Sequence, residues 1–173
     1  MKLALALALL VPALQDKPAK PAKDNPQFPY WASWKPGAWT KSRSEAGKDG
    51  QKMEMELVAK LLEASPEKVV VETTGMIKME GKEFPSPPRK QEMKPKEEQM
   101  GEIDKEGDEE IEVAGKKLAC HWLLFTQDQQ GKKMTSKTWL AKDVPGGVVK
   151  TEIFLEGTAL PVLKVWAVSW GEK

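Results

Sequence analysis

The sequence predicts a mainly β protein: a single curved antiparallel sheet or an unclosed β-barrel built as a meander, with few or no helices beyond an N-terminal signal segment. Three observations predict it. β-Branched and aromatic side chains recur in alternating runs, the signature of strands. Turn sequences such as Asp128–Gly131 and Val144–Gly147 separate these runs. A length of 173 residues indicates one domain.

The N-terminus is typical of an exported protein. Residues 1–14 carry Lys2 and then an almost unbroken Leu/Ala run, too short to span a membrane, which is typical of a secretory signal peptide. A buried N-terminal helix is the alternative. Residues 15–29 are rich in Pro and Lys and predict an extended linker. Residues 30–173 are then a single β-rich domain, which we expect to be periplasmic or secreted.

Three long strands are expected in the first half of the domain. They are Ala38–Ala46, Gln51–Leu62 and Lys68–Met79. The composition of the second also favours a helix, but strict alternation from Lys52 to Leu57 favours a strand. The predicted turns are Gly47–Gly50 and Ser65–Glu67, and Gly75 is expected to mark a bend or bulge.

Proline and acidic residues dominate the middle of the chain. Four prolines within Phe84–Pro95 exclude a central strand and predict an edge strand or a long surface loop. Lys96–Glu112 carries nine acidic residues against two basic ones, which predicts a solvated acidic hairpin with a short strand at Glu109–Val113. The spacing of acidic residues after Asp104 does not match a calcium-binding loop.

A meander of four strands is expected to form the second half. Its strands are Leu118–Thr126, Lys133–Ala141, Val148–Glu156 and Leu160–Trp170. The first and last are apolar on both faces, as expected of strands that are covered on both sides or line a cavity. Pro145, Gly146 and Gly147 set the hairpin between the second and third strands, because proline lacks an amide donor and glycine adopts positive φ.

Residues that usually carry catalysis or metal binding are scarce. Cys120 and His121 are the only cysteine and the only histidine, and neighbours in a strand point to opposite faces. They therefore predict neither a zinc site nor a nucleophilic pair, and we expect Cys120 to be buried and inert. The sequence contains no phosphate loop, dinucleotide fingerprint or nucleophile elbow. It predicts no enzyme activity, no cofactor and no metal.

The charge balance indicates no affinity for nucleic acid. The formal net charge is +1, and loss of Lys2 with the signal peptide leaves 26 basic residues against 26 acidic ones. No global basic field attracts nucleic acid or an anionic membrane. We expect no nucleic-acid partner and no transmembrane segment.

Soft apolar side chains are abundant, with eight methionines and seven tryptophans. Methionine adapts to irregular ligands and tryptophan lines apolar cavities, although an ordinary packed core explains both equally well. If the curved sheet holds a ligand, the residues expected to line the site are Trp122, Leu124, Trp139, Ile153, Leu155 and Trp166.

Two segments resemble a known group of proteins. Glu110–Cys120 is similar to the "strand, small-Gly break, strand, Cys" step of uncharacterised exported bacterial proteins. Lys137–Lys150 resembles their Lys-x-Trp-x-x-x-Asp-Val-Pro-Gly-Gly-x-Val-Lys hairpin. That group distantly resembles the outer-membrane lipoprotein-carrier superfamily (LolA/LolB-like). The resemblance implies an unclosed antiparallel barrel with an apolar concave face that holds acyl chains, although the carriers' lid helices are not evident in this sequence.

Two functions follow from these observations. The first is an exported, non-enzymatic module that binds an apolar or lipid ligand in the concave face of its sheet. The second is a structural or protein-interaction module without a small-molecule ligand, which contacts a protein partner through the acidic segment 96–112 or the aromatic segment 28–34. For the aromatic segment, packing on the domain as a lid is the alternative to a recognition patch.

Overall fold

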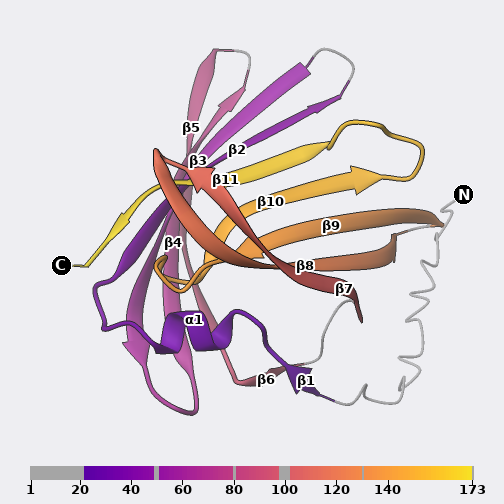
Figure 1. Cartoon of the computed structure of the whole chain (residues 1–173). Coiled ribbons are helices and arrows are strands. Elements are labelled where there is room, and N and C mark those ends of the chain that lie inside the picture. Colours follow the sequence, from indigo (N-terminus) through magenta and orange to yellow (C-terminus); the bar gives the residue numbers. More distant parts are fainter. Residues whose placement is uncertain (1–21, 49–50, 80, 98–101, 130, 173) are drawn as a thin grey trace, which may run out of the picture.

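A computed structural model describes residues 22–48, 51–79, 81–97, 102–129 and 131–172. The body of the protein is a nine-stranded antiparallel sheet that is not closed into a barrel (Figure 1). This arrangement confirms the predicted fold class. The predicted signal peptide and the linker as far as residue 21 lie outside the described residues.

The main sheet contains β2–β5 and β7–β11, and a small second sheet pairs β1 with β6. The strands are β1 Lys23–Asp24, β2 Trp39–Lys48, β3 Gln51–Ala64, β4 Val69–Met79, β5 Lys82–Met93, β6 Lys96–Glu97, β7 Glu102–Val113, β8 Lys116–Gln129, β9 Lys132–Leu140, β10 Val148–Leu155 and β11 Leu163–Gly171. A short helix, α1 (Phe28–Ala32), precedes β2. Within the described ranges, no helix has the length and hydropathy needed to cross a membrane.

Two meanders make up the main sheet. Its spatial order is β5-β4-β3-β2-β11-β10-β9-β8-β7, so the first and last strands of the domain, β2 and β11, pair in its interior. In Figure 1 the strands β3–β5 run steeply whereas β8–β10 cross the view, which reflects the strong twist of the sheet. The edge strands are β5 and β7.

The strand predictions are confirmed in both halves of the chain. The segment for which a helix was the alternative is the 14-residue strand β3, where alternating side chains face two different environments. The proline-rich segment is β5, which lies at the edge of the sheet and pairs with β4 alone. Prolines are tolerated there because an edge strand needs amide donors on only one of its two sides. The register of β4 against β5 shifts between Thr73 and Gly75, where a bend or bulge is predicted.

The acidic segment departs from the prediction of a solvated hairpin. One 12-residue strand, β7, runs from Glu102 to Val113 and pairs with β8 along its whole length. The long apolar strand β8 provides the backbone partner. At the edge of a sheet, acidic side chains keep their contact with water, so a low strand propensity is overcome. Residues 98–101 lie outside the described part of the chain.

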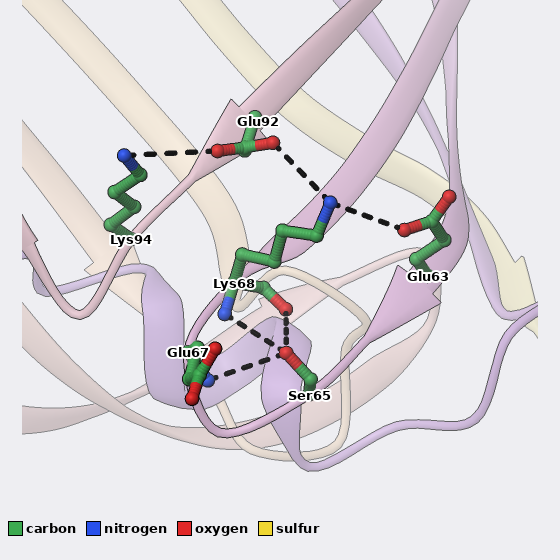
Figure 2. Close-up of polar contacts among 6 residues, drawn as sticks. All are labelled: Glu63, Ser65, Glu67, Lys68, Glu92 and Lys94. Atoms are coloured by element: carbon green, nitrogen blue, oxygen red, sulfur yellow. Dashed lines mark hydrogen bonds and ion pairs between the residues drawn. The ribbon is translucent and has the colours of Figure 1, made fainter.

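The predicted turn between β3 and β4 is fixed by Ser65 (Figure 2). Its hydroxyl accepts hydrogen bonds from the amides of Glu67 (3.3 Å) and Lys68 (3.1 Å) and donates to the Lys68 carbonyl (3.0 Å). The Lys68 ammonium lies 3.5 Å from Glu63 and 3.5 Å from Glu92, and these carboxylates raise the pKa of Lys68. The turn thereby links β3, β4 and β5.

Cross-strand partners share a face of a sheet, so the register defines two faces. The face on which α1 packs is here termed the inner face. On it, the cross-strand partners Leu61 and Val71 are buried together with Phe28 and Trp31 of α1. This cluster also contains Met93 of the edge strand β5, so α1 covers one end of the first meander.

A second core lies on the opposite, outer face. Leu118, Cys120 and Trp139 are buried there with Val113 at the tip of the β7–β8 hairpin. This tip also approaches β11, which is not its neighbour in the sheet. Cys120 is buried as predicted, and its burial raises the pKa of the thiol. The two cores thus lie mainly on opposite faces of one continuous sheet, and Ala167, which lines the inner-face cavity, connects the second core to the inner face.

Candidate functional site

The inner face carries two continuous rows of side chains that cross all nine strands. One row contains Phe84, Ile77, Met55, Ser44, Val165, Thr151, Thr138, Leu123 and Glu106, and the next contains Lys82, Met79, Met53, Ala46, Leu163, Ile153, Ser136, Phe125 and Ile103. Charged residues occur in them only on the two edge strands. Between the edges, both rows consist of apolar side chains and small hydroxyl side chains.

The rows are open to solvent at the sheet edges. Met79 retains 47% of its exposure, Phe84 45% and Ile103 42%. Most of the remaining apolar members are half-buried rather than buried. In a core, such side chains would be packed to near-zero exposure. Half-buried apolar side chains in contiguous rows are instead typical of a surface that binds an apolar partner.

A cavity of about 190 Å³ lies on the inner face next to α1. Trp31 of α1 lines it, together with inward-facing residues of β2–β5, β10 and β11. Both meanders therefore contribute to one cavity, which requires the sheet to curve around it. Its polar lining residues are Gln27, Thr40, Ser42, Thr73 and Gln91, and none of its described lining residues is charged.

The loop Pro145–Gly147 closes one side of this cavity. The two glycines have φ of +77° and +76°, and a Cβ atom added to them would collide with the rings of Trp31 and Tyr30. The buried carbonyl of Pro145 accepts a 2.7 Å hydrogen bond from the Thr40 hydroxyl. The loop between β9 and β10 is therefore held to both α1 and β2, and only glycine fits against the aromatic rings.

Hydroxyl groups line the inner face along β2. Thr40, Ser42 and Ser44 occupy successive inward positions of this strand, since Thr40 and Ser42 line the cavity and Ser44 lies between Met55 and Val165 in the row above. Ser44 is 3% exposed, and its Oγ atom has no hydrogen-bond partner among the described residues. A buried hydroxyl without a partner costs free energy and calls for an explanation.

The six predicted ligand-lining residues do not share one face. Ile153 and Leu155 lie on the inner face, since they pair with Ser136 and Met134 there. Four others, Trp122, Leu124, Trp139 and Trp166, belong to the outer face by their register. Alternation identifies which residues share a face, but it does not tell which face is covered by α1.

The outer-face tryptophans form a cation–π cluster. The Lys137 ammonium lies 4.4 Å from the ring centroids of both Trp122 and Trp139. The Trp139 indole donates a hydrogen bond to Glu109, whose carboxylate also lies 2.9 Å from Lys137. Both contacts hold the pKa of Glu109 below its usual value. These contacts give Trp122 and Trp139 a stabilising role within the protein.

A pocket of about 590 Å³ with charged side chains in its lining lies against Tyr30 of α1. It contains His121, whose Nδ1 lies 2.9 Å from Asp108 and whose Nε2 lies 3.5 Å from Glu106. The His121 side chain is 37% exposed rather than buried. Cys120 also lines this pocket, but its raised pKa keeps the thiol protonated at neutral pH. In the part of the chain that the structure covers, no cluster of three or more His, Cys, Asp or Glu could hold a metal.

Two features of the site escape the sequence reasoning. The aromatic segment 28–34 packs on the domain, as the lid alternative predicts, with Phe28 and Trp31 buried, but it does so as the helix α1, which the sequence does not predict. Five residues are too few to show a helical period, and proline at the second position only marks a place where a helix can begin. Ser44 is the other feature. The alternation of Thr40, Ser42 and Ser44 is visible in the sequence, but only the register places these hydroxyls opposite apolar partners.

No protein-family model, curated protein or solved structure matches this chain, so the register and the contacts of its own residues define the candidate site.

Proposed function

We propose that this protein is an exported, non-enzymatic module that binds an apolar or lipid ligand on the inner face of its sheet. The observation that carries the proposal is the pair of inner-face rows, most of whose apolar members are half-buried or exposed although α1 covers the adjoining part of the same face. Export is inferred from the signal-like N-terminus alone. The resemblance to the lipoprotein-carrier superfamily suggests the same use of an unclosed barrel.

The size of the cavity decides how such a ligand would lie. A cavity of about 190 Å³ is smaller than the roughly 300–1,000 Å³ of sites that enclose a whole small molecule. We therefore place one end of the ligand in the cavity and its chain along the two open rows. Burial of apolar surface contributes roughly 25 cal/mol per Å², so an extended chain gains affinity from each strand it crosses.

The first test is binding by the exported form of the protein. Native mass spectrometry of protein purified gently from its host is expected to show a bound lipid whose mass is lost on delipidation. The delipidated protein is then expected to enhance the fluorescence of N-phenyl-1-naphthylamine, a neutral apolar probe. A ligand-free mass together with no probe binding would contradict the proposal.

A matched pair of variants locates the site. Ile153 and Leu155 face inward on β10, whereas Phe154 between them faces outward. The double variant Ile153→Thr/Leu155→Thr is expected to weaken probe binding about tenfold, because it removes apolar contact area from the ligand. The control Phe154→Thr, on the same strand, is expected to keep the wild-type affinity. Equal losses in both variants would place the binding site elsewhere.

A further inference from the structure

We infer that the ligand is a neutral acyl ester, with its uncharged polar head in the cavity beside α1 and its acyl chain along the inner-face rows. This inference rests on the proposed function, because it names the ligand class of the same site. It depends on two observations that the apolar rows do not supply. These are the uncharged polar lining of the cavity and the unpartnered hydroxyl of Ser44.

The cavity lining selects against a charged head group. Its polar side chains are two amides and three hydroxyls, from Gln27, Gln91, Thr40, Ser42 and Thr73. A carboxylate or phosphate placed there would lose its hydration without meeting a cation, which is strongly unfavourable. Glycerol-type hydroxyls and an ester carbonyl need only hydrogen bonds, which amides and hydroxyls supply.

Ser44 marks the point where the polar head gives way to the acyl chain. It lies one inward position beyond Ser42 on β2, between Met55 and Val165. Val165 also lines the cavity. The Ser44 Oγ atom is covered by its neighbours in the free protein, so an ester carbonyl would accept its hydrogen bond once the Met55 or Val165 side chain moves aside. Beyond Ser44, the next inward residue on β2 is Ala46, and its cross-strand partners are Met53 and Leu163.

One cation faces the inner side near this region and offers a rival explanation. Arg89 on the edge strand β5 is the cross-strand partner of Thr73, which lines the cavity. Arg89 is exposed, so its guanidinium is solvated. If the ligand carried an anionic head, Arg89 would be the residue that binds it, and the test must separate the two cases.

The test compares two ligands that differ only in the head group. Monodecanoylglycerol and decanoate are titrated at pH 8 against the delipidated protein loaded with N-phenyl-1-naphthylamine. Monodecanoylglycerol is expected to displace the probe at a concentration at least tenfold lower. Ser44→Ala is expected to weaken monodecanoylglycerol binding roughly two- to tenfold more than it changes probe binding, the effect of losing one hydrogen bond that only the ester can make. Arg89→Gln is expected to change neither.

The possible results separate the neutral-ester assignment, the role of Ser44 and the proposed function. Decanoate that competes as well as the ester, or loses affinity in Arg89→Gln, would overturn the neutral-ester assignment while leaving apolar binding intact. An unchanged affinity of Ser44→Ala for the ester would overturn the role of Ser44. Failure of the neutral probe itself to bind wild-type protein would instead remove the proposed function. The thermal midpoint of Ser44→Ala is expected not to fall, because the substitution removes an unpaired buried hydroxyl.

Discussion

At the scale of single residues, the loop between β9 and β10 shows how local conformation and tertiary packing combine. Gly146 and Gly147 both adopt positive φ, and both lie directly against aromatic rings of α1. Any other residue would meet two separate penalties there. One is the strain of an L-residue in the left-handed region, and the other is a collision with a ring that has little room to move.

Gly157 provides a control that separates the two penalties. Its φ is +81°, but a Cβ atom added there would meet nothing within 4 Å. Gly157→Ala is expected to cost about 1 kcal/mol of unfolding free energy from backbone strain alone. Gly146→Ala is expected to cost about 2 kcal/mol more, because it also displaces the buried Trp31 ring. Urea unfolding measures both, and equal costs would show that the ring moves freely.

At the scale of elements, the pairing of β2 with β3 is reinforced by an ion-pair cluster on the outer face. The Glu56 carboxylate lies 2.6 Å from Arg43 and 2.8 Å from Lys41. Hydrogen bonds from these two cations hold the pKa of Glu56 at about 2, below its usual value of 4.5. All three side chains are partly exposed, so solvent screens the ion pairs and their effect is best seen in the pH dependence of stability.

The sign of that dependence follows from the lowered pKa. Between pH 4.5 and pH 2 the unfolded chain binds a proton at Glu56 that the folded protein does not. Stability from this group is therefore complete above pH 4.5 and is lost as the pH falls toward 2. Glu56→Gln is expected to flatten the pH dependence of the urea midpoint over this interval. Arg43→Gln is expected to do the same in part, and a profile unchanged in both variants would contradict this assignment.

At the scale of the whole molecule, two cores share one sheet. The first lies under α1 on the inner face, and the second lies under the β7–β8 tip on the outer face. The seam between β2 and β11 joins them through eight cross-strand residue pairs. Because the sheet is continuous across the seam, loss of either core weakens the β2–β11 pairing on which the other core depends. We therefore expect the two meanders to unfold together.

Native-state hydrogen exchange tests this cooperativity. The amide of Leu61, bonded to the Ala38 carbonyl, reports on the first meander, and the amide of Ala141, bonded to the Gly147 carbonyl, reports on the second. Their opening free energies are expected to agree within about 1 kcal/mol. A difference of several kcal/mol would show that the meanders are independent units and that the seam opens first.

The sequence predicts the strands better than the site, for a physical reason. Alternation and turn residues are local properties, so β3 and β9 can be read directly from the chain. Face selection is not local. Trp139 and Ile153 have similar signals, yet they lie on opposite faces of the sheet. The choice between those faces depends on where α1 docks, and Trp31 docks by contacts with residues far away in the chain.

The pairing of β2 with β11 also sets the order in which the protein can be completed. As the chain emerges N-terminus first, β2–β5 can fold into hairpins early, but β2 has no second partner until the last strand arrives. During that interval the prolines of β5 disfavour pairing of another chain at one edge of the growing sheet. At the other edge, β2 exposes unpaired backbone amides and carbonyls. Folding therefore ends with the pairing of β2 and β11, which is intrinsically slow because the two strands are far apart in the sequence. A chain shortened before β11 would keep a permanent template for aggregation at its centre.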